Sequence, residues 1–186
     1  MKAQLIHRIL TGIAGLGLVL LIASPSVFAQ KDDSEEINNL LLKAKTYALR
    51  AADDSAILDS FTRSSLDFRS HAVKLNKIRD DFNEVGKLAK QMSEASSEGS
   101  PWQQEAVRNI YPLLQSMADN LTSCIDHLNK NQTQIHMPAY QDYVHANFEY
   151  ASRTSEMIND YVDYQKAKSR SLDLEQKLEL PKGGQE

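Results

Sequence analysis

The chain has 186 residues and is weakly acidic, with 21 lysines and arginines against 25 aspartates and glutamates. These charges are spread along the sequence rather than gathered into a basic patch, which argues against a nucleic-acid partner. Cys124 is the only cysteine, so one chain can form neither an internal disulfide nor a zinc site built on paired cysteines.

The first 29 residues have the pattern of a secretory signal peptide. Lys2 and Arg8 stand near the start, no acidic residue occurs, and an apolar run extends from residue 9 to residue 22. This run is about 14 residues long, whereas a membrane-spanning helix needs roughly 20 apolar residues. A cleavable leader is therefore a better interpretation than a retained anchor helix.

A cleavage site follows the apolar run. Pro25 ends the run, and Val27 and Ala29 place small or medium side chains at the two positions that a signal peptidase reads. No cysteine follows for lipid attachment, and no pair of arginines precedes the run. We expect residues 1–29 to be removed and the protein to be exported to a periplasmic or extracellular compartment.

The chain after the leader has the composition of one soluble domain, which we place at residues 30–180, followed by a disordered tail at residues 181–186. Without Lys2 and Arg8 it carries 19 basic and 25 acidic side chains, a net charge of about −6. It contains no second apolar run long enough to cross a bilayer. We therefore expect no membrane contact after cleavage.

Few residues interrupt the elements of this domain. Between residues 30 and 180 the only glycines are Gly86 and Gly99, and the only prolines are Pro101, Pro112 and Pro138. Apolar residues recur at steps of three and four, which is the period of a helix face packed against neighbours, and strand-like alternation is absent. The domain is therefore predicted to consist of long helices.

The first predicted helix begins after Asp33, whose side chain can cap the first turn while Glu36 returns the bond. The polar triplet at residues 53–55 interrupts its stripe, which leaves a kink or a break into two helices open. The second predicted helix begins near Ser65. The two apolar stripes are Ile37, Leu41, Ala44, Ala48, Ala51 and Leu58, and then Phe68, His71, Leu75, Ile78, Phe82, Val85, Ala89 and Met92.

The third predicted helix has the strongest local start signal in the chain. Ser100 can cap it, Pro101 lies in the first turn where its missing N–H costs nothing, and Gln103 occupies the capping-box position. Pro112 lies inside this helix and should bend it. The residues predicted to face inward are Val107, Ile110, Leu114, Met117, Leu121, Cys124 and Leu128.

The fourth predicted helix starts at Pro138, after a loop at residues 129–137. Its inward face is predicted to be Val144, Phe148, Ala151, Ile158 and Val162. Polar residues dominate after Gln165, so the last turns should project beyond the domain. Four segments of roughly 30 residues, each about 45 Å long and joined by short loops, predict an all-α, up-down-up-down four-helix bundle with coiled-coil-like seams.

No catalytic or cofactor motif of an established kind is present. Phosphate-binding loops need clustered glycines, which the domain lacks before its tail. Di-iron bundles carry a Glu-x-x-His on each of two helices, and the nearest pattern here is the single pair Asp142 and His145. No nucleophile is paired with a base. We expect a non-enzymatic binding or scaffolding protein without a resident cofactor.

One constellation favours an alternative function, a metal- or haem-binding bundle. If the helices alternate in direction, His71, Cys124, His127 and His145 all lie near one end of the bundle, at about the same depth. Imidazole and thiolate suit zinc, copper or nickel, and Asp67, Asp142 or Glu149 could complete the shell. The non-functional alternative is that the histidines are structural or solvated and that the cysteine is a small apolar core residue.

A row of aromatic and methionine side chains follows the fourth predicted helix at steps of seven: Tyr143, Tyr150, Met157 and Tyr164. Such a row is most often the edge of a core, with hydroxyls that reach water or backbone. If it is exposed instead, it is a docking surface for a protein or peptide partner. Both interpretations remain open from the sequence.

The leader interpretation predicts the N-terminus of the mature protein. N-terminal sequencing or intact-mass measurement of protein recovered from its native compartment should give a chain that begins at Gln30. Recovery of a chain that still carries residues 1–29 would contradict export by a cleaved signal.

Overall fold

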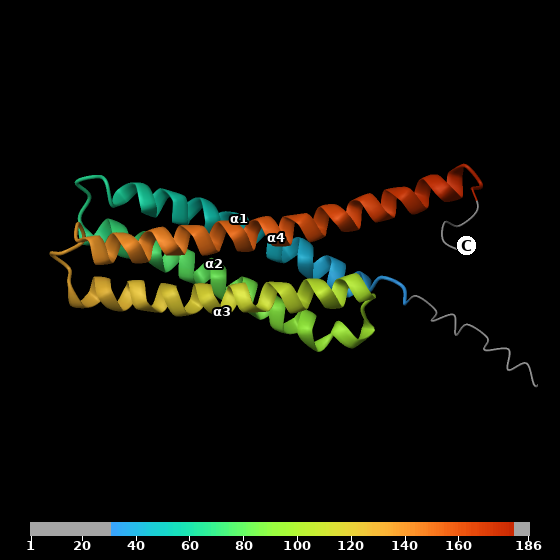
Figure 1. Cartoon of the computed structure of the whole chain (residues 1–186), viewed down its shortest axis with the longest axis horizontal. Helices are drawn as coiled ribbons and strands as arrows, with labels where there is room; N and C mark the ends of the chain where they lie inside the picture. Colours follow the sequence, from blue (N-terminus) through green and yellow to red (C-terminus); the bar gives the residue numbers. More distant parts are fainter. Residues whose placement is uncertain (1–30, 181–186) are drawn as a thin grey trace, which may run out of the picture.

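A computed structural model describes residues 31–180 of the chain (Figure 1). This part is all-helical, as predicted, and contains no strand. The predicted leader and the predicted tail at residues 181–186 lie outside the described residues. The elements in chain order are α1 at Glu35–Phe61, α2 at Phe68–Glu94, a short 3-10 turn η1 at Ser96–Glu98, α3 at Pro101–Lys130 and α4 at Pro138–Lys177.

The four long helices form a bundle in which consecutive helices run in opposite directions (Figure 1). Each helix packs against two others, α1 against α2 and α4, and α3 against α2 and α4. The stripes predicted for the first and third helices are buried throughout. The stripe of α2 is buried from His71 to Met92, whereas Phe68 at its start is only partly buried.

The helices α3 and α4 start at the predicted residues, whereas the starts of α1 and α2 differ from the predicted ones by one to three residues. Ser34, not Asp33, caps α1 and accepts a hydrogen bond from the Ile37 amide. Asp67 caps α2 and accepts from the Ser70 amide. At α1 the reason is that Asp33 is engaged elsewhere, because its carboxylate accepts a hydrogen bond from Trp102 and pairs with Lys168.

α1 is continuous through the polar triplet at residues 53–55. Asp53 is exposed and Asp54 forms an ion pair with Lys74 of α2 at 2.6 Å. Ser55 is the one member that turns inward, and it is buried. The triplet therefore interrupts the apolar pattern without breaking the helix. α3 likewise continues through Pro112.

The prediction for the inward face of α4 is wrong at one residue, and the face is more polar than predicted. Phe148 is only partly buried, and Asn147 beside it takes the interior position. A step of three from Val144, rather than four, leads to Asn147, and both steps are compatible with a helix face. The other buried residues added on this helix are Tyr140, Thr154 and Ser155.

A buried glutamine closes the end of the bundle where α1 and α3 begin. The Gln103 side chain is fully buried. Its Oε1 accepts hydrogen bonds from the backbone amides of Ser34 at 2.8 Å and Ser100 at 2.9 Å. Its Nε2 donates to the Ser34 carbonyl at 2.8 Å and to Asn38 Oδ1 at 2.9 Å. The predicted capping residue thus also fastens α3 to the start of α1.

Asp33 extends this connection to α4. Its carboxylate accepts a hydrogen bond from Trp102 Nε1 and pairs with Lys168 Nζ, each at 2.7 Å. Partial burial on its own would raise the pKa of Asp33, but hydrogen bonds from Lys168, Ser100 and Trp102 outweigh it and hold the pKa below its usual value. One carboxylate therefore ties together three of the four helices at this end.

Beyond this end α4 continues as a projecting arm (Figure 1), as predicted. Its last buried residue is Val162, and Leu172, Leu174 and Leu178 are exposed along the arm. Among the described helices none combines the length and apolarity of a membrane span.

Replacement of Gln103 tests its role in the fold. Gln103→Leu removes four hydrogen bonds and leaves the backbone amides of Ser34 and Ser100 without an acceptor, so unfolding free energy should fall by about 2–4 kcal/mol. The Ser34 carbonyl still accepts a hydrogen bond from the Asn38 amide. Urea unfolding followed by circular dichroism measures the change. The neighbouring Gln104 is exposed and makes one bond, to the Gly99 carbonyl, so Gln104→Leu should cost less than about 1 kcal/mol. Equal losses in the two variants would contradict the role given to Gln103.

Candidate functional site

The predicted histidine end is the end of the bundle that carries the α1–α2 and α3–α4 loops (Figure 1). His71 is fully buried, and its Nδ1 lies 3.0 Å from the hydroxyl of Tyr140. The ring of His127 stacks on the ring of Tyr140, with centroids 5.9 Å apart and planes 24° apart. Two of the four predicted residues thus meet around one tyrosine.

The other two predicted residues lie in different surroundings. Cys124 is fully buried, and burial raises the pKa of its thiol to about 12, so it is protonated at neutral pH. His145 is exposed on α4, where its Nδ1 lies 3.4 Å from Asp59 and its Nε2 lies 3.6 Å from Glu149. Over residues 31–180 no three His, Cys, Asp or Glu side chains are grouped as a metal shell would require.

The histidine end nevertheless contains polar atoms without hydrogen-bond partners. Nε2 of His71 and Nε2 of His127 are both buried and unpaired within the described part of the chain. The side-chain amide of Asn147 is also buried, with the thiol of Cys124 as its polar neighbour. A buried polar group without a partner costs roughly 1–3 kcal/mol. This end of the core is therefore polar and less favourable than an apolar core.

The predicted aromatic row is mostly the edge of the core. Tyr143, Tyr150 and Met157 are partly buried and pack against the buried cluster. Tyr164 is exposed and contacts the edge of Trp102, with ring centroids 5.2 Å apart. The row therefore offers little continuous apolar surface to a partner.

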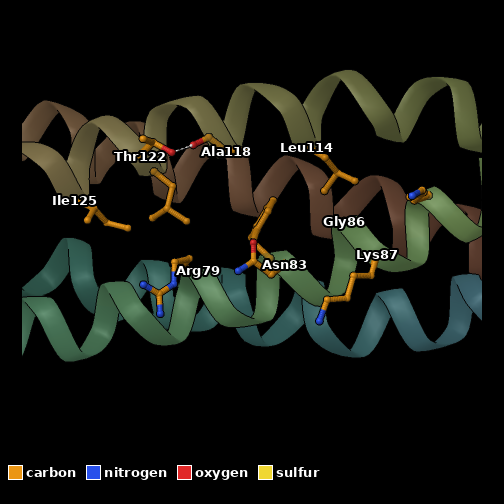
Figure 2. A pocket seen from close by; sticks show the side chains of 11 residues that line it. Arg79, Asn83, Gly86, Lys87, Leu114, Ala118, Thr122 and Ile125 are labelled. Atoms are coloured by element: carbon orange, nitrogen blue, oxygen red, sulfur yellow. Dashed lines mark hydrogen bonds between the residues drawn. The ribbon is translucent and has the colours of Figure 1, made fainter.

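The structure contains a groove that the sequence analysis did not anticipate. It runs between α2 and α3 on one side of the bundle and has a volume of about 520 Å³ (Figure 2). Ligand pockets typically measure about 300–1,000 Å³. Its lining residues are Arg79, Phe82, Asn83, Gly86, Lys87 and Lys90 of α2, with Leu114, Ala118, Leu121, Thr122 and Ile125 of α3.

The floor of this groove is apolar. Phe82, Leu114 and Leu121 belong to the buried core and form its base. The one hydroxyl on the α3 side, that of Thr122, donates to the Ala118 carbonyl at 2.8 Å (Figure 2). This bond satisfies the hydroxyl within α3, so the groove presents hydrocarbon along most of its length.

Gly86 leaves the floor open at the middle of α2. A Cβ built on Gly86 would meet no atom within 4 Å. Glycine inside a helix costs about 1 kcal/mol relative to alanine, so its presence needs a reason. Gly99 has such a reason, because a Cβ there would lie 2.7 Å from the Ile37 side chain. Gly86 has no comparable contact within residues 31–180, and its effect is to widen the groove.

The rim of the groove is cationic. Arg79, Lys87 and Lys90 line it from α2, and no acidic residue is among the lining residues. Each of these cations has an acidic neighbour on α2, but the pairs are exposed, and exposed pairs contribute at most about 1 kcal/mol. The three positive charges therefore remain available to an anionic ligand.

Two features of the groove's lining residues can be recognised in the sequence, each on its own. Gly86 is the single glycine inside a predicted helix, and Arg79, Lys87 and Lys90 share one helical face at steps of eight and three. Neither signal identifies a groove, because the groove exists only where α2 meets α3. No protein-family model matches the chain, and comparisons with curated proteins and with solved structures found no match either.

The burial of His71 predicts a dependence of stability on pH. Burial is the main cause that lowers the pKa of His71 below 6.5, His136 lowers it further, and Asp67 opposes this. In the unfolded chain the imidazole has its ordinary pKa of about 6.5. Below this pH the unfolded state therefore binds a proton at His71 more readily than the folded state does. Unfolding free energy should therefore fall as pH falls from about 7.5 to 5.

Urea unfolding at a series of pH values measures this slope. His71→Gln removes the titrating group and should be less stable at pH 7.5 but flatter with pH than the original chain. Parallel pH profiles for the two proteins would show that His71 does not carry the dependence.

Proposed function

We propose that this protein is an exported, non-enzymatic binding protein whose ligand site is the groove between α2 and α3. The observation that carries the proposal is the open apolar floor at Gly86, a position where glycine weakens the helix and is not required by any contact. Export rests on the leader sequence alone.

The chemistry of the lining residues supports binding rather than catalysis. The titratable groups of the groove are Arg79, Lys87 and Lys90. Acid-base catalysis at neutral pH needs a group that titrates nearby, and covalent catalysis needs a nucleophile beside a base. Three exposed cations over a hydrocarbon floor suit recognition of a molecule that is apolar on one side and anionic on the other.

The groove supports a binding role better than the two surfaces considered from the sequence. At the histidine end, His145 is turned away from His71 and His127 and is paired with Asp59 and Glu149. Along α4 three of the four members of the aromatic row, Tyr143, Tyr150 and Met157, are partly buried against the core. The groove is apolar and accessible from outside, which is the combination that a binding surface needs.

A fluorescent dye tests the groove directly. 8-Anilinonaphthalene-1-sulfonate has an apolar aromatic body and one negative charge, so it should bind the folded protein with a rise in fluorescence. Gly86→Leu fills the floor and should weaken binding at least about tenfold. Gly86→Ala adds one methyl group and should bind the dye while raising unfolding free energy by about 0.5–1 kcal/mol.

The matched control is Ala167→Leu, which adds an exposed leucine to the projecting part of α4, away from the groove. This variant should bind the dye as the original chain does. Unfolding curves of all variants verify that the dye reports the native state and not a loosened one. Equal dye affinity in Gly86→Leu and the original chain would overturn the assignment of the groove.

A further inference from the structure

We infer that the occupant of the α2–α3 groove is an acidic amphipathic helix of a partner protein. The inference rests on the proposed function, because it names the ligand class of the same groove. Three features of the groove point to this occupant: its length and direction, its exposure along one side, and the sign of its rim charges.

The groove has the dimensions of a helix-binding surface. Its α2 lining extends from Arg79 to Lys90, eleven steps of 1.5 Å or about 16 Å, which is three helical turns. Both walls are helices that run along the groove (Figure 2). A helix of the partner can lie on them at the usual interaxial distance of about 8–10 Å and become a fifth helix of the bundle.

Other occupants fit the groove less well. An extended peptide gains affinity by adding a strand to an open sheet edge, and the described residues include no strand. A single alkyl chain is narrower than a helix, and small-molecule pockets bury about 70–90% of their ligand. The groove is only partly enclosed, so an alkyl chain would leave one flank in water, whereas a helix can turn its polar face outward.

The positive charges on the rim favour a partner with negative charge. Arg79, Lys87 and Lys90 stand along one edge of the apolar floor, and no acid lines the opposite edge. Their own acidic neighbours Asp80, Glu84 and Glu94 lie outside the lining. A partner helix with leucine-like side chains on one face and glutamates along one border matches both features, and a basic helix would meet like charges.

Two synthetic peptides test the inference. Both are fluorescein-labelled, amphipathic and 15 residues long, with the same leucine face and with a polar face of either glutamate or lysine. Fluorescence anisotropy against the full mature chain should show at least tenfold tighter binding of the glutamate peptide, weakening as salt rises. Gly86→Leu should abolish this binding.

Charge reversal on the rim supplies the specificity test. The triple variant Arg79→Glu, Lys87→Glu and Lys90→Glu should invert the preference and bind the lysine peptide more tightly. The neutral triple Arg79→Gln, Lys87→Gln and Lys90→Gln should remove the preference, which keeps the test usable if charge reversal unfolds α2. The matched control Lys43→Glu, Lys130→Glu and Arg170→Glu changes the net charge equally at exposed positions outside the groove and should keep the preference.

The outcomes separate this inference from the proposed function. If the dye binds and Gly86→Leu blocks it but neither peptide binds, the groove is a ligand site and the helix inference is wrong. If sodium myristate displaces the dye in that case, the occupant is a lipid anion. Equal binding of both peptides overturns the acidic specificity. If neither dye nor peptide binds, the proposed function fails as well.

Discussion

A bundle of four amphipathic helices buries its apolar stripes completely only if side chains of sufficient size close each of its four sides. The side between α2 and α3 does not fully meet this condition, because a groove of about 520 Å³ lies there. Gly86 contributes no side chain and Ala118 contributes a methyl group where the two helices face each other (Figure 2). Phe82 and Leu114 on the floor beneath therefore keep a small exposed fraction, 6% and 8%. This incomplete side creates the candidate site and costs some stability, since an open groove forfeits dispersion contacts and hydrophobic burial.

The two ends of the bundle are held in different ways. At one end Gln103 and Asp33 join α1, α3 and α4 through hydrogen bonds that satisfy nearly every polar atom involved. At the other end Tyr140 contacts both His71 and His127, and Nε2 of each imidazole has no partner within residues 31–180. Buried polar groups that lack partners lower the cost of local opening, so the histidine end should open more readily than the Gln103 end.

The sequence predicted the helices far better than it predicted the site. Apolar spacing of three and four identified every long helix, and the signals at Ser100, Pro101 and Pro138 placed two starts at the residues observed. It failed at Phe148, because burial on a helix face depends on rotation about the axis, which the neighbouring helices set and the sequence pattern leaves ambiguous by one residue. It also assigned the cap of α1 to Asp33, a residue whose carboxylate is engaged by Trp102 and Lys168 from distant parts of the chain.

By itself the sequence determined the number of the helices, their approximate bounds and most of their inward faces, because these follow from periodicity and capping, which are local properties of the chain. It also placed His71, Cys124, His127 and His145 near one end, since alternation of direction follows from short loops. Only the tertiary structure decided that His145 faces outward while His71 and His127 meet at Tyr140. The groove is likewise a tertiary property, because its lining residues come from two helices and form a groove only when α2 and α3 pack together.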